Sequence, residues 1–343
     1  MEQPVCLWPV GAELGEGPIW HAASKSVYFV DIRGRQVHRC AADGTRRQSW
    51  SAPGRPGFIV PAVGATDSGG TKNLGSRRGP PWRGNDEDIV EAVTLRSVAP
   101  APRRPSAGAQ VRTGTTGFII GLDDGLYHFN EQTGQFSPLR HIEADLPRNR
   151  FNDGFAAADG SLWFGSMDAG ETDPTGSLYS LHPGGRLTTV DSGYIITNGP
   201  AMSPDGKTLY HTDTLGKKIY AFDVLPDGTA TRKRLFIATQ APGHPDGMAV
   251  DADGGIWVAM FRGARIDRYN PAGELVATIA FPVSNITKLA FGGADLRTAF
   301  VSTAWKGLSV EERTGEPLAG GLFTFRTDTP GLAQHTISLQ DIA

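Results

Sequence analysis

The stretch GMAVDADGGIWVAMFRGARIDRYNPAGELVATIAF, residues 247–281, contains four short segments with β-type composition, each separated from the next by a turn. The segments are GMAVDA, GIWVAMF, ARIDRYN and ELVATIAF, and the Asp253-Gly254 pair between the first two is typical of a tight hairpin turn. Four short strands joined in this way form one antiparallel sheet. The stretch therefore predicts one blade of a β-propeller.

The same pattern returns along the chain at a nearly constant spacing. Short β-rich runs are YFVDI (28–32), FIIGL (118–122), LWFGS (162–166), LYHTD (209–213), IWVAM (256–260) and AFVST (299–303). The last five begin 44, 47, 47 and 43 residues apart. Such a period, with about four strands per unit, is typical of propeller blades. Six units predict an all-β fold, a single six-bladed β-propeller over residues 1–343.

One segment interrupts the period. The first two runs begin 90 residues apart, and the surplus falls on residues 66–115, which are rich in Gly, Pro and Arg and have almost no strand pattern. We expect these residues to form a disordered or loose loop, inserted in the turn between the two inner strands of the second blade. Two alternatives remain for this segment: it binds a partner, or it is non-native translated sequence.

Composition narrows the classes of function. A formal net charge of −3 gives no electrostatic case for binding nucleic acid or an anionic membrane, and no apolar run approaches the length of a membrane span. Cys6 and Cys40 are the only cysteines, which favours a reducing compartment. We expect a soluble, cytoplasmic protein, and its oligomeric state stays open. The sequence contains no Gly-x-Ser-x-Gly elbow, dinucleotide fingerprint, Walker loop or histidine-based zinc motif.

Polar residues precede the glycine that leads into the innermost strand in four of the units. They are Glu16 before Gly17, Asn152 and Asp153 before Gly154, Asn198 before Gly199, and Asp246 before Gly247. In the last three units this glycine stands six, seven and seven residues before the next turn glycine. The loops that lead into the innermost strands lie at one mouth of a propeller channel. Four blades therefore present oxygen-bearing side chains at matching positions around that mouth.

Three of these side chains suit a divalent cation. The carboxylates of Glu16 and Asp246 would repel each other at the channel mouth unless a cation lay between them, and the amide oxygen of Asn198 completes a set of hard oxygen donors. The alternative is that Asp and Asn before Gly simply form turns, as Asp205 does in its Asp-Gly pair. Glu16 stands between two glycines and has no such turn-forming reason.

Six motifs together resemble the senescence-marker-protein/gluconolactonase family of sugar lactonases, and within it the bacterial aldonolactonases that act on xylono-, arabino- or gluconolactones. The motifs are LGEGPIW (14–20), RFNDG (150–154), ITNGPAMSPDGKTLYHTDT (196–214), PDGMAVDADGGIWVA (245–259), FGGADLRTAFVST (291–303) and PLAGGLF (317–323). They span nearly the whole chain apart from the segment 66–115, which departs from the family pattern.

The resemblance implies a six-bladed propeller with one divalent metal ion (Ca, Zn, Mn, Mg or Fe) at the channel mouth. Glu16, Asn198 and Asp246 would be its ligands, and Asp246 would also be the catalytic acid/base residue. Arg150 and Asn152 would hold hydroxyl groups of the substrate.

Two positions have alternatives within this resemblance. In the RFNDG unit, counting from the glycine points to Asp153, whereas the family motif points to Asn152. Some relatives place a further acidic substrate contact after the run that matches GSM, and here Asp168 and Glu171 both remain candidates.

The expected activity is metal-dependent hydrolysis of an aldono-lactone to its aldonic acid. Two alternatives remain because a fold does not fix its chemistry. One is a broader-specificity esterase or organophosphate hydrolase on the same propeller. The other is a non-enzymatic, calcium-binding propeller.

Overall fold

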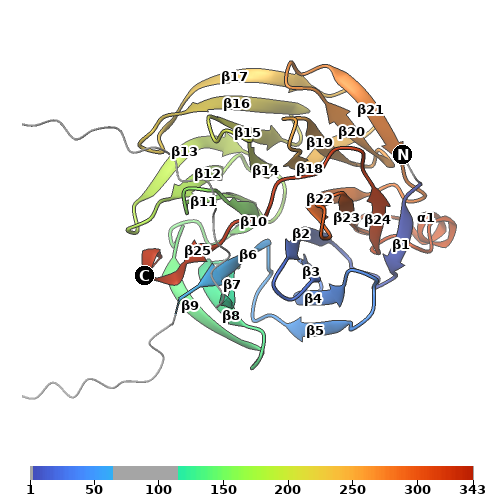
Figure 1. Ribbon diagram of the computed structural model, residues 1–343, viewed down its shortest axis with the longest axis horizontal. Helices are drawn as coiled ribbons and strands as arrows, with labels where there is room; N and C mark the ends of the chain where they lie inside the picture. Colours follow the sequence, from blue (N-terminus) through green and yellow to red (C-terminus); the bar gives the residue numbers. More distant parts are fainter. Residues whose placement is uncertain (1–2, 65–114, 343) are drawn as a thin grey trace, which may run out of the picture. The chain divides into compact units, whose positions relative to one another are not determined.

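The computed structural model describes residues 3–64 and 115–342, which form six antiparallel sheets arranged around a common axis (Figure 1). Each sheet holds four strands that follow one another from the axis outward, apart from one added strand in the second sheet and one exchanged strand in the last. The innermost strands β2, β6, β10, β14, β18 and β22 contact one another in this order around the ring. The prediction of a six-bladed β-propeller is confirmed.

The first three blades contain the following strands. Blade one consists of β2 (Gly15–His21), β3 (Ser26–Asp31), β4 (Gln36–Ala41) and β5 (Gln48–Ser51). Blade two consists of β6 (Phe58–Val63), β7 (Thr115–Gly121), β8 (Gly125–Asn130) and β9 (Gln135–His141). Blade three consists of β10 (Asn149–Ala156), β11 (Leu162–Asp168), β12 (Gly176–Leu181) and β13 (Leu187–Tyr194).

The last three blades repeat the arrangement. Blade four consists of β14 (Thr197–Met202), β15 (Thr208–Asp213), β16 (Lys218–Val224) and β17 (Ala230–Ala238). Blade five, the unit that was traced in full from the sequence, consists of β18 (His244–Val250), β19 (Ile256–Phe261), β20 (Arg265–Tyr269) and β21 (Leu275–Ala280). Blade six consists of β22 (Ile286–Gly292), β23 (Thr298–Thr303), β24 (Leu322–Arg326) and β1 (Val5–Trp8).

The N-terminal strand closes the ring. β1 pairs antiparallel with β24, with Val5 opposite Thr324 and Cys6 opposite Phe323, so the first strand of the chain is the outermost strand of the last blade. The period of the sequence did not identify this strand. Because β1 leads directly into β2, its backbone hydrogen bonds to β24 tie blade one to blade six.

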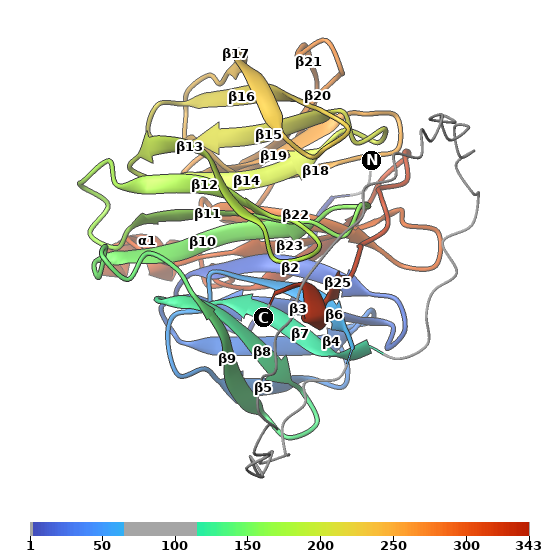
Figure 2. The same cartoon turned by 90° about the vertical axis from the view of Figure 1, so that its left-hand side faces the viewer.

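The C-terminal segment adds a further strand at the axis. β25 (Ile337–Ser338) pairs in parallel with β6, with Ile337 opposite Ala62. Figures 1 and 2 both show β25 beside β6, with the C-terminus close by. The short helices α1 (Val310–Gly315) and η1 (Leu339–Asp341) are the helices of the described residues, and no helix in these ranges is long and apolar enough to cross a bilayer.

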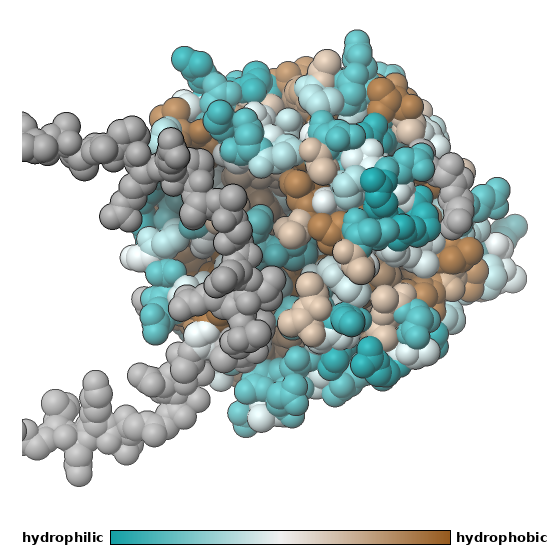
Figure 3. Space-filling model, in the orientation of Figure 1, coloured by the Kyte–Doolittle hydropathy of each residue, from teal (hydrophilic) through white to brown (hydrophobic). Residues whose placement is uncertain are grey.

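The core is divided among the interfaces between blades. Each pair of neighbouring blades buries its own apolar cluster, as where Trp257 of blade five meets Phe291 of blade six at 5.8 Å between ring centroids. The alternating apolar residues of one sheet therefore become buried only when the next blade packs on them. On the face shown in Figure 3, hydrophilic residues lie over β5 and along the rim.

The predicted insertion falls almost entirely outside the described residues. β6 and β7 are consecutive in the described part of the chain and are paired antiparallel, with Val63 opposite Thr115. Thr115 begins β7, and the rest of the segment 66–115 is not described. That it is a disordered loop, and that residues 1–343 make a single domain, therefore stay predictions.

Candidate active site

One cavity of about 260 Å³ brings together all the predicted site residues from four blades. Its lining consists of Leu14, Glu16, Arg150, Asn152, Met167, Glu171, Ile196, Asn198, Thr214, Leu215, His244, Asp246, Phe261, Arg262 and Lys306. The polar members come from positions that are far apart in the sequence, since β2, β10, β14 and β18 each contribute at their first residues. The cavity therefore lies at the mouth where the innermost strands begin.

The same backbone irregularity occurs where each of these four strands begins. The register with the second strand shifts between Glu16 and Ile19, Phe151 and Asp153, Asn198 and Ala201, and Pro245 and Met248. A β-bulge bends the strand and re-aims a side chain, so that polar residues beside these shifts can face the mouth. Two of the following glycines, Gly17 and Gly199, have φ of +53° and +39°, a conformation that glycine adopts readily.

A chain of hydrogen bonds holds the amide side chains of the site in one orientation. Arg150 Nη1 donates to Asn152 Oδ1 at 2.6 Å, and Asn152 Nδ2 donates to Asn198 Oδ1 at 2.8 Å. Asn198 Nδ2 donates in turn to the hydroxyl of Thr214 at 2.9 Å. Both nitrogen ends are thus used by the protein, and Asn198 Oδ1 keeps a second lone pair that can serve a ligand.

Two of the carboxylic acids that line the cavity, Glu16 and Asp246, disfavour ionisation. Burial raises the pKa of Glu16 well above its usual range, and the nearby carboxyls of Asp246 and Asp153 raise it further. The pKa of Asp246 is also raised well above its usual range, first by burial and then by Asp153. Two buried acids that oppose each other's ionisation are a typical arrangement for binding a cation.

The donor set fits one hard divalent cation. Glu16 and Asp246 supply carboxylate oxygens and Asn198 an amide oxygen, which are the donors that such ions prefer. Three protein ligands leave positions for water or substrate. Among the described residues there is no group of three or more His, Cys, Asp and Glu placed to hold a metal, so the set depends on the amide as well as on the two acids.

Arg150 is the buried cation of the site. It also donates to the backbone carbonyl of Phe151 at 3.1 Å. Burial lowers the pKa of Arg150 to about 10, against the opposing effect of Glu171. The guanidinium therefore remains charged at neutral pH and can donate to a bound oxygen.

Of the two acidic candidates after the GSM run, Glu171 lies at the cavity and Asp168 does not. Glu171 lines the cavity and forms an ion pair with Lys306, which lines it too. The carboxyl of Asp168 instead accepts hydrogen bonds from the backbone of Thr172 and Asp173, which hold its pKa at about 2. Asp168 thus stabilises the turn after β11.

Of the neighbours Asn152 and Asp153 in blade three, Asn152 lines the cavity and Asp153 does not. Asp153, the residue next to the glycine, accepts from the backbone N–H groups of Gly154 and Gly199 and pairs with Lys288. The register shift between Phe151 and Asp153 explains why counting from the glycine pointed to the wrong neighbour. The structure thus agrees with the motif at this position.

Sequence reasoning missed three basic residues of this region. Lys306 and Arg262 lie in loops after β23 and β19, and Lys288 lies on β22 beneath the site. Isolated lysines and arginines carry no spacing signal, so only their contacts reveal them. For Lys306 the sequence offers one signal, which is that the residue follows closely after the strand pattern of blade six.

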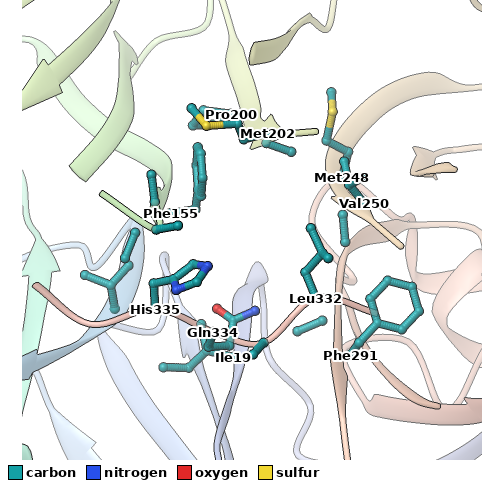
Figure 4. A pocket seen from close by; sticks show the side chains of 18 of the residues that line it. Ile19, Phe155, Pro200, Met202, Met248, Val250, Phe291, Leu332, Gln334 and His335 are labelled. Atoms are coloured by element: carbon teal, nitrogen blue, oxygen red, sulfur yellow. The ribbon is translucent and has the colours of Figure 1, made fainter. Parts of the chain in front are cut away.

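A second cavity, of about 330 Å³, lies at the other end of the inner strands (Figure 4). It is lined mainly by apolar side chains, among them Phe155, Met202, Met248, Phe291 and Leu332. Gln334 and His335 project toward it from the C-terminal segment (Figure 4). Its lining includes neither Glu16 nor Asp246. The smaller cavity, which holds acids, amides and a guanidinium, is therefore the candidate active site.

Comparison with known proteins places the chain in a family. Residues 14–78 and 87–305 match the SMP-30/Gluconolactonase/LRE-like region. L-arabinolactonase of Azospirillum brasilense is 30% identical over 324 residues, which cover 93% of this chain and 90% of that protein. 6-deoxy-6-sulfogluconolactonase of Pseudomonas putida is 32% identical over 220 residues, covering 64% and 76%.

A solved structure has the same fold over almost the whole chain. It is a calcium-binding protein, regucalcin, from Agrobacterium tumefaciens, with a TM-score of 0.77 and 25% identity, covering 96% of both chains. The match to the family extends over most of the sequence and includes all five predicted site residues. The chain belongs to the SMP-30/gluconolactonase/LRE-like family.

Proposed function

We propose that this protein is a sugar lactonase that hydrolyses an aldono-lactone to its aldonic acid with one divalent cation bound by Glu16, Asn198 and Asp246. Its family and its lactonase relatives support a hydrolase of cyclic sugar esters. The observation that carries the assignment of the site is the convergence of two buried, mutually repelling acids and an oriented amide in one cavity.

The size of the cavity suits a small substrate. At about 260 Å³ it lies just below the range of about 300–1,000 Å³ typical of pockets for drug-sized ligands. One sugar ring fits such a space. The choice among xylono-, arabino- and gluconolactones depends on hydroxyl contacts within this volume.

A bound divalent cation would supply Lewis acidity toward the lactone carbonyl, worth several kcal/mol of charge stabilisation in the transition state. The protein's part is to present the two acids and the amide of Asn198 together. The hydrogen bonds from Asn152 and to Thr214 fix the orientation of that amide.

Asp246 would move the proton. Its carboxylate accepts a proton from the attacking water as the new C–O bond forms, and returns it to the ring oxygen as the ester bond breaks. The product is the open-chain hydroxy acid. A carboxylate that contacts a cation has a lowered pKa and is a weak base, so the activation of the carbonyl must supply much of the rate.

Arg150 and Asn152 would orient the substrate. One Arg150 nitrogen is engaged by Asn152 and Phe151, and the rest of the guanidinium is available for substrate oxygens. Glu171, which pairs with Lys306, would be the further acidic contact to a hydroxyl. Such contacts hold the ring in the geometry that the proton transfer requires.

The direct test compares Asp246→Asn with Asp205→Asn, a substitution in an exposed turn. Lactone opening is followed by acid release with D-xylono-, L-arabino- and D-gluconolactone, using protein loaded with Mn²⁺ or Ca²⁺. We expect Asp246→Asn to lose nearly all turnover and Asp205→Asn to keep it. Unchanged hydrolysis by folded Asp246→Asn would reject the assignment.

Two competing functions have their own signatures. Aryl esters or organophosphates hydrolysed faster than all three lactones would favour a broader esterase. The solved calcium-binding relative gives the second competitor a specific basis. Equal rates of lactone opening with and without protein, across several divalent ions, would favour a non-enzymatic calcium-binding role.

A further inference from the structure

A buried ion pair lies directly beneath the candidate metal ligands. Lys288, on β22, has a side chain that is 8% exposed, and its ammonium group donates to Asp153 Oδ1 and approaches the carbonyl of Gly154 at 3.5 Å. Asp153 also accepts from the N–H of Gly154 at 2.7 Å and of Gly199 at 2.9 Å. Both charges are thus fixed in place by several contacts.

This pair touches the backbone beside three of the polar positions at the mouth. Gly154 follows Asn152 and Asp153, and Gly199 follows Asn198. The stem of Lys288 packs on Gly247, the residue after Asp246: a side-chain carbon at Gly247 would lie 2.6 Å from Lys288 Cγ. Lys288 also lines the apolar cavity of the other mouth. The pair therefore lies between the two cavities, one residue away from the candidate ligands.

Without Lys288, the buried region beneath the candidate metal ligands would carry an excess of negative charge. Glu16, Asp246 and Asp153 are three carboxyls in one buried region, and Asp153 does not line the cavity where a cation would bind. Left unpaired, Asp153 would act on a cation as an additional negative charge from below. Paired with Lys288, it forms a unit that is close to neutral at a distance.

We propose that Lys288 is a positioning residue that sets the affinity of the site for its divalent cation by neutralising Asp153. The proposal rests on the metal site of the proposed function. A single unit charge this close, in a buried and weakly screened region, changes the affinity for a divalent ion by about tenfold or more. Removing the charge of Lys288 and removing the charge of Asp153 must then change the affinity for the cation in opposite directions.

The test is a set of variants titrated with Mn²⁺ by calorimetry after removal of bound metal by chelation. Lys288→Met, which keeps most of the stem that packs on Gly247, is expected to bind Mn²⁺ about tenfold more tightly, and Asp153→Asn about tenfold more weakly. The double variant is expected near the wild-type affinity, as is Lys288→Arg, which keeps the charge. Far-UV circular dichroism and thermal melts establish that each variant is folded.

A purely structural role predicts a different result. Both single variants would then weaken binding, or leave it unchanged, while lowering the melting temperature, and this outcome overturns the proposal. If Lys288→Met does not fold, Lys288→Gln is titrated in its place, and the same opposite signs are required. Two outcomes refute the metal site itself. One is that wild-type protein binds no Mn²⁺, and the other is that the Glu16→Gln variant binds Mn²⁺ as well as wild type does. If Glu16→Gln abolishes Mn²⁺ binding but neither Lys288 variant changes the affinity, the metal site stands and only the inference about Lys288 is refuted.

Discussion

The two ends of the inner strands differ although they belong to the same six sheets. Where the strands begin, register shifts in four blades direct Glu16, Asn152, Asn198 and Asp246 into a polar cavity. A few residues further along the same strands, side chains such as Met248 line an apolar cavity. The comparison shows that the propeller supplies two cavities of similar size at its two mouths, and that the polar one lies where four inner strands carry a one-residue irregularity.

The largest expected effect compares two residues of one strand. Asp246→Asn is expected to lower kcat by about a thousandfold, within the range of about 10²–10⁴ that general acid–base catalysis contributes. Met248→Leu, at the apolar end of β18, conserves volume and is expected to cost less than about 1.5 kcal/mol of stability and to leave kcat within about twofold. Steady-state lactone hydrolysis measures both. Comparable losses in the two variants would remove the functional difference between the mouths.

Removal of the cation should lower lactone hydrolysis at the polar mouth almost as strongly as Asp246→Asn does. Dialysis against a chelator is expected to reduce lactone hydrolysis to near the spontaneous rate, because the carbonyl then lacks its Lewis acid. Titrating Mn²⁺, Zn²⁺ or Ca²⁺ back should restore the rate in wild type but not in Glu16→Gln. Full activity of thoroughly stripped protein would contradict a metal-dependent site.

Substitution of the buried guanidinium should mainly change substrate binding. Arg150→Ala is expected to raise KM by about tenfold or more, with a smaller effect on kcat, since it removes hydroxyl contacts made in both ground and transition states. Arg234→Ala, which removes an exposed ion pair with Asp223, serves as the control. An unaltered KM in Arg150→Ala would exclude its proposed role.

Substitution of Glu16 should raise the stability of the metal-free protein although it lowers the activity. The pKa of Glu16 is raised in the folded state, so the stability that this group contributes is fully present below its unfolded pKa of about 4.3 and is lost as the pH rises. Glu16→Gln cannot ionise and should therefore melt a few degrees higher than wild type at pH 7, with the difference shrinking toward pH 4. Thermal melts of chelator-treated protein across this range provide the measurement. A lower melting temperature for Glu16→Gln at pH 7 would show that the acid is not strained.

The smallest effect is expected far from the polar mouth. Val63 and Thr115 face each other at the ends of β6 and β7, so a two-residue Asn-Gly turn can join these strands directly. A chain in which this turn replaces residues 64–114 is expected to keep kcat/KM within about threefold. A folded but inactive deletion would show that the removed segment is needed at the site.

The blades and the three candidate metal ligands could be predicted from the sequence because their signals are local. Each blade is a run of hairpins whose turn residues and strand lengths repeat in the chain, and Glu16, Asn198 and Asp246 stand at a fixed place in that repeat. The fold prediction is confirmed. The roles of the site residues stay predictions, although the structure brings all of them to one cavity.

Other features required contacts between distant parts of the chain. That β1 completes blade six, and that β25 pairs with β6, depends on where the chain ends meet after the ring has formed. The preference for Glu171 over Asp168 depends on Lys306, from another blade.

The sequence by itself determined the six-bladed repeat, since hairpin chemistry acts between neighbouring residues, and it predicted the candidate oxygen donors from their place in that repeat. Tertiary structure alone showed that a register shift underlies the position of Asn152, which the family motif had already indicated, and that Lys288 of blade six pairs with Asp153 of blade three. The physical reason is that a register shift and a buried ion pair depend on the packing of separate sheets around one axis, which no local pattern encodes.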